Sequence, residues 1–468
     1  FVFFLSNYNS SKWRSFKIGW LFGFGYFISN IYWITNSLTF DNQFKNLILI
    51  ALIIIPLFLG LFYGLVTFIC SLINLRLNFS SVLIFVTIFS SVEFIRGFIM
   101  GGFPWNLHAY SWLEYINFIQ ILSLTGTYAF NLLSITLFMS PLFFFIKNSL
   151  RTKIILIITI MILITTNFYY GSTVITKYNE NSNIKINSTF KIVSPKIKID
   201  RFFNDEEPFE IIKELIILSN PNSKKDTIFI FPEGILTSIS LKNLKTYKEL
   251  FSNNYSQNHK IILGINSEKD SKIFNSLVVI DNSVNVLAKY NKNNLVPFGE
   301  FLPFENLFSK FGINEIIAGY KSYSADSERK ILTINNIRLL PLICYEIIYS
   351  GKLNQSDEDF DFIINISEDG WFGNSIGPHQ HFSHSIFRAI EEGKNLIRST
   401  NNGITAYVNS KGQILERIES TDKGVIEVEN YKTQNKTLFS MYGNKIFFYF
   451  LLFYITLIFF LKINREIK

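Results

Sequence analysis

The sequence predicts a multi-span α-helical membrane domain joined to an α/β sandwich domain outside the membrane. The first observation is charge: of the 80 charged side chains, 12 fall in residues 1–170, 63 in residues 171–443 and 5 in residues 444–468. The second is that long apolar runs occupy only the two charge-poor segments. We therefore expect a transmembrane domain, a globular domain, and a C-terminal transmembrane helix with a cytoplasmic tail. A disordered chain, a collagen and a purely cytosolic globule are excluded.

Six apolar runs are long enough to cross a bilayer, which takes about 20 residues. They cover residues 16–35, 46–75, 80–99, 117–146, 152–170 and 445–462. Residues 1–5 resemble the end of a further, truncated span, and the chain does not begin with Met. We therefore expect the natural protein to be longer at its N-terminus.

Lysine and arginine fix the predicted orientation, because loops rich in them stay in the cytoplasm. Ten positive side chains flank the spans on one side: Lys12, Arg14, Lys17, Arg76, Lys147, Arg151, Lys153, Lys462, Arg465 and Lys468. The alternate loops, 36–45 and 97–116, hold one Lys and no Arg. Residues 171–443 are therefore expected outside. The net charge of +8 reflects this topology, and we expect no nucleic-acid partner.

Strand and helix patterns alternate through the globular segment. Short β-rich runs cover 190–193, 227–231, 261–265 and 361–366, and amphipathic helical stretches cover 209–218 and 379–396. Two hairpins are expected, 277–280 with 284–288 and 331–334 with 337–342. This mixture of hairpins and βαβ units predicts an α/β sandwich.

Three candidate chemical groups follow predicted strands. Glu233 ends Phe-Ile-Phe-Pro-Glu-Gly, Lys292 lies in the loop 290–300, and Cys344 ends Leu-Ile-Cys-Tyr-Glu. Open α/β sheets place ligands at strand ends. A carboxylate can accept the thiol proton, an ammonium can stabilise thiolate and oxyanion, and the thiolate can attack a carbonyl. The N–H of Tyr345 is a candidate second oxyanion donor. Spacing alone leaves a structural role open for each residue.

The motifs around these residues resemble a known superfamily. Pro-Glu, Tyr-Asn-Lys-x-x-Leu-Val-Pro-Phe-Gly-Glu and Ile-Cys-Tyr-Glu are similar to the Glu-Lys-Cys triad of the nitrilase superfamily. Further motifs resemble its apolipoprotein N-acyltransferase branch: Gly102-Phe-Pro-Trp105, Trp371-Phe-Gly373, Gln380-His-Phe382 and Arg398-Ser-Thr-Asn-Asn-Gly403. The resemblance implies a nitrilase-like αββα sandwich, with Glu233 as general base, Lys292 as oxyanion stabiliser and Cys344 as nucleophile. It also implies Glu300 and Glu346 as supporting carboxylates.

The resemblance implies a ping-pong reaction at the bacterial inner membrane, with the catalytic domain facing the periplasm. A phospholipid, phosphatidylethanolamine by preference, acylates the cysteine. The thioester then acylates the α-amino group of the S-diacylglyceryl cysteine of an apolipoprotein. No cofactor is implied, and we expect a monomer.

Two positions depart from the family pattern. Gly234 stands where the resemblance leads us to expect Thr or Ser, which removes a hydroxyl beside Glu233. Glu368 stands where Asn is common, which changes the expected charge near the pocket.

Several residues have both a functional and a structural interpretation. Glu93 and Arg96, near the outer end of a span, and Trp105 and Trp371 are candidate lipid or substrate contacts. Phe298, Phe301 and Phe304 form either an apolar lid or a packed loop.

The histidines and cysteines suggest neither a metal site nor a disulfide. His381 and His384 share a helix face, but no further ligands stand at the spacing of a known metal site, so we expect no metal. Cys70 lies in a span, so no disulfide with Cys344 is expected.

Two other function classes stay open. A membrane-tethered amidase or nitrilase acting on a periplasmic substrate has the same triad, but it leaves the 290–300 loop and the Phe-Pro-Trp motif unexplained. A non-catalytic lipoprotein-binding scaffold has no need for all three triad residues.

Overall fold

The computed structural model describes residues 11–73, 75, 78–145, 150–204, 206–303, 322–351, 353–354, 358–432 and 435–466. The truncated span at residues 1–5, Phe304, Arg76, Lys147 and Lys468 lie outside these described residues. The chain forms two compact units, one of residues Phe1–Glu180 with Lys436–Lys468 and one of Asn181–Asn435.

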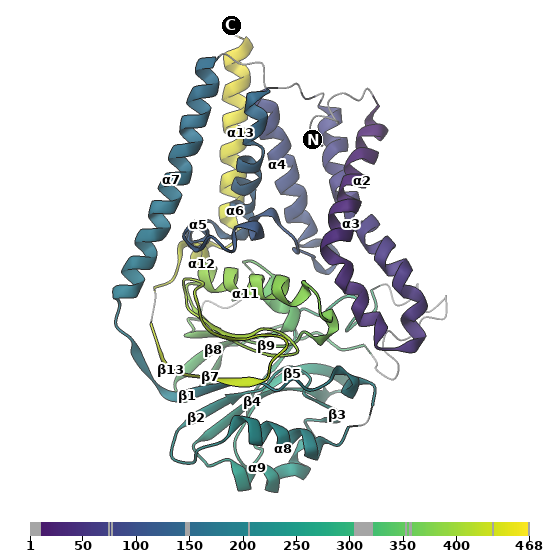
Figure 1. The fold of residues 1–468 in the computed structure, drawn as a ribbon, viewed down its shortest axis with the longest axis vertical. Helices are drawn as coiled ribbons and strands as arrows, with labels where there is room; N and C mark the ends of the chain where they lie inside the picture. The colour runs from purple at the N-terminus through teal and green to yellow at the C-terminus, as the bar shows by residue number, and fades with distance from the viewer. Residues whose placement is uncertain are drawn as a thin grey trace. The chain divides into compact units, whose positions relative to one another are not determined.

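The first unit is helical (Figure 1). Its helices are α2 (Lys12–Ile31), α3 (Ile48–Leu72), α4 (Phe79–Arg96), α5 (Ile116–Ile119), α6 (Leu122–Phe138), α7 (Leu150–Glu180), α12 (Leu438–Tyr442) and α13 (Lys445–Glu466). Each of the six predicted apolar runs overlaps one of the long helices, and α7 extends ten residues beyond its run, to Glu180. Among the described residues, four helical segments are long and apolar enough to cross a membrane: Asn42–Leu72, Phe79–Arg96, Leu122–Phe144 and Leu150–Glu180. The apolar part of α13, Lys445–Leu461, is shorter.

Large apolar side chains cover the outer surfaces of this unit. Leu49 and Ile54 on α3, Leu163 on α7 and Phe453 on α13 are all more than half exposed. Such a surface is unfavourable in water and is typical of helices in contact with lipid.

The second unit contains two sheets. The seven-stranded sheet has the order β13 (Gly424–Tyr431), β1 (Ile184–Ser194), β2 (Thr227–Ile230), β4 (His259–Lys269), β5 (Lys272–Ile280) and β6 (Val286–Asn291), and β3 (Leu236–Ser240) also pairs with β4. The six-stranded sheet has the order β12 (Ile414–Ile418), β11 (Thr405–Val408), β10 (Asn395–Asn401), β9 (Phe362–Glu368), β8 (Ile337–Ile343) and β7 (Leu332–Ile334).

The two sheets pack face to face between layers of helices. Phe190 on β1 lies edge-on to Phe362 on β9, with ring centroids 5.2 Å apart. Helices α8 (Pro208–Ser219) and α9 (Lys248–Asn254) cover the seven-stranded sheet, and α11 (Gly377–Glu392) covers the other (Figure 1). The predicted αββα sandwich is confirmed.

One predicted helix ends early. The pattern predicted a helix through residue 396, but α11 ends at Glu392. Gly393 then takes a left-handed conformation with φ of +66°, which glycine adopts without steric cost. The next residues, Asn395–Asn401, form the buried strand β10.

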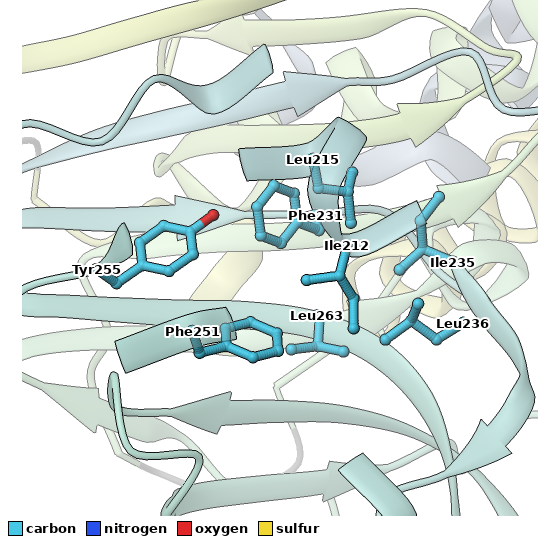
Figure 2. A pocket seen from close by; sticks show the side chains of 8 residues that line it. All are labelled: Ile212, Leu215, Phe231, Ile235, Leu236, Phe251, Tyr255 and Leu263. Atoms are coloured by element: carbon cyan, nitrogen blue, oxygen red, sulfur yellow. The ribbon is translucent and has the colours of Figure 1, made fainter. Parts of the chain in front are cut away.

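The apolar core beneath α8 and α9 is closely packed. Eight side chains surround a cavity of about 10 Å³ (Figure 2): Ile212, Leu215, Phe231, Ile235, Leu236, Phe251, Tyr255 and Leu263. A volume of this size holds at most one water molecule. This cavity is therefore a packing defect and not a substrate pocket.

Candidate active site

Strand direction brings two of the three predicted triad positions, Glu233 and Lys292, to one edge of the seven-stranded sheet. The charges of both act on the thiol of Cys344, which follows a strand of the other sheet. Glu233 follows β2, Lys292 follows β6 and Cys344 follows β8. Strand β2 is parallel to β4, and β6 returns antiparallel to β5, which is itself antiparallel to β4. Strands β2 and β6 therefore run the same way, and their carboxyl ends lie at the same edge.

Three donors hold the Glu233 carboxylate. Its Oε1 accepts hydrogen bonds from Asn275 Nδ2 at 2.7 Å and from Lys292 Nζ at 3.3 Å. Its Oε2 accepts from the backbone N–H of Glu368 at 3.0 Å. These contacts fix both oxygens of a side chain that is almost fully buried.

Lys292 lies between two carboxylates. Its Nζ also donates to Glu300 Oε1 at 2.9 Å, and the residue is only 1% exposed. Burial by itself lowers the pKa of Lys292, but the attraction of Glu233 and Glu300 outweighs it, so the pKa stands well above its usual value. The side chain is therefore a fixed positive charge and not a base.

Cys344 sits on a sharp turn. It has φ of +51°, a strained conformation for a residue with a side chain. Its carbonyl accepts from Asn365 Nδ2 at 3.4 Å and from His381 Nε2 at 3.3 Å, and both partners are fully buried. The surrounding structure therefore holds the strained turn in place.

The surroundings of Cys344 favour its thiol form over the thiolate. Burial and the negative charge of Glu233 raise its pKa well above the usual value, and the charge of Lys292 offsets only part of that rise. A thiol is a poor nucleophile, so attack on a carbonyl needs a base that removes the proton. Glu233 is the carboxylate with the strongest effect on this pKa.

The two predicted supporting carboxylates have different contacts. Glu300 touches the same groups as Glu233: its Oε1 accepts from Asn275 Nδ2 at 2.7 Å as well as from Lys292, and its Oε2 accepts from the backbone N–H of Val296 at 2.9 Å. Glu300 therefore fixes Lys292 and its own loop.

Glu346 connects the loop that carries Lys292 to the turn that carries Cys344. It is fully buried and accepts five hydrogen bonds, from Tyr290 Oη at 2.6 Å, Arg329 Nη2 at 2.7 Å and the backbone N–H groups of Asn293 at 2.9 Å, Asn294 at 3.1 Å and Ile343 at 2.8 Å. Its described hydrogen bonds include none to a triad side chain.

Substitution of Glu346 by glutamine is expected to lower the free energy of unfolding by about 3 kcal/mol, because it breaks a buried pair with Arg329. Burial raises the pKa of Glu346, but Arg329 and the hydrogen bonds from Tyr290 and Ile343 lower it further, to below its usual value near 4.5. The stabilisation from Glu346 is therefore present above about pH 4.5 and is lost as the pH falls through the lowered pKa. Thermal unfolding between pH 3 and pH 7 checks this: the wild-type protein should lose more stability on acidification than Glu346→Gln, and parallel curves would contradict it.

Sequence reasoning missed several residues of the site. Asn275 on β5 donates to both Glu233 and Glu300. Asp369 binds His381 at 3.0 Å and Arg398 at 2.8 Å, so it anchors the ring that holds the Cys344 carbonyl. For Asn275, the available signal was a polar side chain within a mostly apolar strand, since such a residue needs buried partners.

The departure at Gly234 has a backbone explanation. Gly234 has φ of +55°, and a Cβ atom there would lie 2.9 Å from the Phe202 ring. A side chain of any kind is therefore strained at this position. The departure at Glu368 is also compensated, because its buried carboxylate pairs with Arg201 and accepts from Asn401 Nδ2 at 2.7 Å.

Close packing beneath Glu233 gives a direct test. A Cβ on Gly264 of β4 would lie 2.5 Å from Glu233 Cα and 2.9 Å from the Gly234 nitrogen, both of which are backbone atoms. Gly264→Ala is therefore expected to displace Glu233 and lower kcat/KM by about 100-fold. Gly424→Ala is the matched control, since its Cβ meets only the end of the Ile418 side chain. Equal kcat/KM values for the two variants would contradict the expectation.

The other candidate residues near the triad are aromatic side chains. Trp371 packs on Phe202, with ring centroids 4.9 Å apart. Tyr345 is buried with its ring edge-on to Tyr349, 5.6 Å between centroids. Phe298 is more than half exposed. Their roles in substrate binding stay predictions.

The membrane candidates lie inside the helical unit and not at its surface. Glu93, Arg96 and Trp105 are each 1% exposed. Arg96 lies 3.8 Å from Glu93 and donates to the carbonyls of Phe103 and Trp105, so it fixes the loop after α4. Headgroup binding by these residues stays a prediction.

The sequence matches two families. Residues 1–140 match the family model of the apolipoprotein N-acyltransferase N-terminal domain, and residues 220–430 match that of carbon-nitrogen hydrolases. Proteins named apolipoprotein N-acyltransferase are among the relatives. The one from Rhizobium rhizogenes is 30% identical, over 90% of this chain and 81% of its own length. The one from Rickettsia prowazekii is 31% identical, over 93% of this chain and 87% of its own length. A CN-hydrolase superfamily structure from Xanthomonas campestris covers 53% of this chain and 91% of its own, at 15% identity and a TM-score of 0.37.

The αββα layers and the match over residues 220–430 define a carbon-nitrogen hydrolase domain, of the nitrilase-like class. The N-terminal match is to a more specific family, and relatives of that family are 30% identical over most of their length. The chain therefore belongs to the apolipoprotein N-acyltransferase family. The predicted resemblance, fold class and acyltransferase class are confirmed. The apolar helices and the family make it a multi-pass protein of a bacterial inner membrane.

Proposed function

We propose that this protein transfers an acyl chain from a membrane phospholipid, through a thioester on Cys344, to the N-terminal α-amino group of diacylated apolipoproteins. The observation that carries the proposal is the buried contact of Glu233 with Lys292 beside the strained Cys344 turn, in a chain of this family. Lipids and lipoproteins are the substrates that the family name implies.

The first half-reaction breaks the ester. Glu233 takes the thiol proton of Cys344, and the thiolate attacks the carbonyl carbon of the sn-1 acyl ester. Lys292 and the N–H of Tyr345 stabilise the tetrahedral oxyanion. When the intermediate collapses, the carbon–oxygen bond breaks and Glu233 gives its proton to the glycerol oxygen. The products are the acyl-enzyme and a lysophospholipid.

The second half-reaction forms the amide. The α-amino group of the lipoprotein cysteine attacks the thioester, and Glu233 accepts the proton that the nitrogen loses. The carbon–sulfur bond breaks, and the proton returns to Cys344. The same three side chains serve both steps, since Glu233 alternates between base and acid.

Membrane anchoring suits both substrates. Burial of each methylene group of an acyl chain is worth about 0.8 kcal/mol, so the chains remain in the bilayer. A catalytic domain tethered by helices meets them at the membrane surface. Phosphatidylethanolamine as donor, the periplasmic face as location and a monomeric state are parts of this proposal, and the charge pattern of the loops supports the orientation.

Reconstitution separates the candidate functions. The protein is placed in phosphatidylethanolamine vesicles with a labelled sn-1 chain, and an S-diacylglyceryl cysteine peptide is added. Label in an amide on the peptide supports N-acylation. Label released as free fatty acid, with or without peptide, would favour the hydrolase alternative. Label that stays in phospholipid would favour the non-catalytic scaffold.

A further inference from the structure

Arg201 lies beneath the base-bearing loop without touching any triad side chain in the described contacts. It belongs to a short 3-10 helix, Ile199–Phe202, that follows β1, and it is 1% exposed. Its Nε donates to the carbonyl of Gly234 at 3.1 Å, and its Nη1 donates to the carbonyl of Lys198 at 2.9 Å. Its Nη2 pairs with the Glu368 carboxylate. One guanidinium thus contacts residues from three separate segments of the chain.

Glu368 reaches the base through its backbone. Its N–H donates to Glu233 Oε2 at 3.0 Å, while its own carboxylate accepts from Arg201, Asn401 and the backbone N–H of Gly370. Arg201 is therefore connected to Glu233 in two ways, through the neighbouring Gly234 carbonyl and through Glu368.

The Arg201–Glu368 pair lies in a region rich in carboxylates. Glu233, Glu300, Glu368 and Asp369 bring four carboxylates to one buried region, where like charges repel strongly. Lys292 pairs with two of them and Arg398 with Asp369, so Arg201 is the described cation that pairs with Glu368. Burial raises the pKa of Glu368 above its usual value, and the charge of Arg201 opposes that rise, so Arg201 favours the ionised, hydrogen-bonded form of Glu368.

We propose that Arg201 is a positioning residue for Glu233: it binds the Gly234 carbonyl and the Glu368 carboxylate, and so keeps the Glu233 carboxylate aimed at the Cys344 thiol. This inference deepens the proposed function, since it rests on Glu233 as the base. It links Gly234 and Glu368, the two positions where the resemblance led us to expect other residues, through a single side chain.

The test measures the rate at which iodoacetamide alkylates Cys344 in the whole chain, as a function of pH. Cys344→Ala is measured in parallel, so that any alkylation of Cys70 can be subtracted. This reaction needs no lipid. Arg201→Met is expected to lower the rate roughly 100-fold at every pH, because it frees both groups that hold Glu233 in place. Arg201→Lys keeps the charge but loses the planar set of donors, so it should rescue part of the loss and lower the rate only about tenfold. Arg201→Met with Glu368→Gln should be no slower than Arg201→Met alone, because the two residues act on Glu233 through one contact.

A rate in Arg201→Met within about threefold of wild type would overturn the proposal, as would full additivity of the two losses in the double variant. Arg201→Lys keeps the test decisive if Arg201→Met does not fold, since a wild-type rate in Arg201→Lys would also overturn it. Arg338→Met is the control for loss of an arginine–carboxylate pair at the surface, because Arg338 is 41% exposed and pairs with Asp361 at 2.8 Å, at the far end of β8 from Cys344. If wild-type protein shows the expected alkylation profile but transfers no acyl chain, the proposed function fails while this inference stands.

Discussion

Cys344→Ala is expected to abolish acyl transfer, with a loss of roughly 10⁴-fold or more in kcat. The described residues place one cysteine, Cys344, beside Glu233 and Lys292, since Cys70 is buried in α3 of the helical unit. With no sulfur, no thioester forms, and neither half-reaction has a substitute nucleophile. Product amide on the lipopeptide is the measurement.

Cys70→Ala is the matched control for the nucleophile. It removes an equally buried thiol and is expected to leave the rate within about twofold, because a buried cysteine mainly acts as a small apolar side chain. Substantial transfer by Cys344→Ala would refute the thioester route. A loss in Cys70→Ala as large as in Cys344→Ala would show that the assay reports folding.

Lys292→Met is expected to give the second largest loss, roughly 10³-fold in kcat. The substitution removes the positive charge that faces the developing oxyanion. It also leaves Glu233 and Glu300 to share Asn275 with no cation between them. Removal of one partner from a buried charge pair costs about 3–5 kcal/mol, so the variant is also expected to unfold at a lower temperature.

Lys191→Met separates these two effects. Lys191 on β1 is a buried lysine of the same unit that pairs with Glu427 at 3.0 Å and donates to the Ser219 carbonyl at 3.0 Å. Its loss is expected to lower stability but leave the kcat of folded protein near the wild-type value. Similar kcat losses in both variants, once corrected for the folded fraction, would contradict a catalytic role for Lys292.

Strand ends were the most predictable part of the site. The run 227–231 is mostly apolar and is followed by Pro232 and Glu233, so the sequence alone indicated that Glu233 follows a strand. The hairpin before Lys292 was also visible from its turn residues. Strands of like direction end at one edge, and in the fold this brings Glu233 and Lys292 together.

Strand β10 could not be predicted from hydrophobicity. Its sequence, Asn-Leu-Ile-Arg-Ser-Thr-Asn, is mostly polar, although every residue is buried. Arg398 within it is tolerated because Asp369 and Asn365 bind its guanidinium. Only the assembled fold brings these partners together.

Pairs distant in sequence were equally hidden. Arg201 and Glu368 are 167 residues apart, and nothing in either local sequence indicates the other. Glu368 therefore looked like an uncompensated charge near the pocket. The fold shows that it is paired, and that its backbone N–H, which any residue would supply, is the group that contacts Glu233.

A single-turnover experiment tests the central claim most directly. Wild-type protein in vesicles of phospholipid with a defined sn-1 chain is quenched before peptide is added, and its intact mass is measured. We predict a gain of one acyl chain, located on the peptide that contains Cys344, removed by neutral hydroxylamine and lost when the lipopeptide acceptor is added. An acyl group on any other residue, or amide formation with no acyl-enzyme at any time point, would contradict the account.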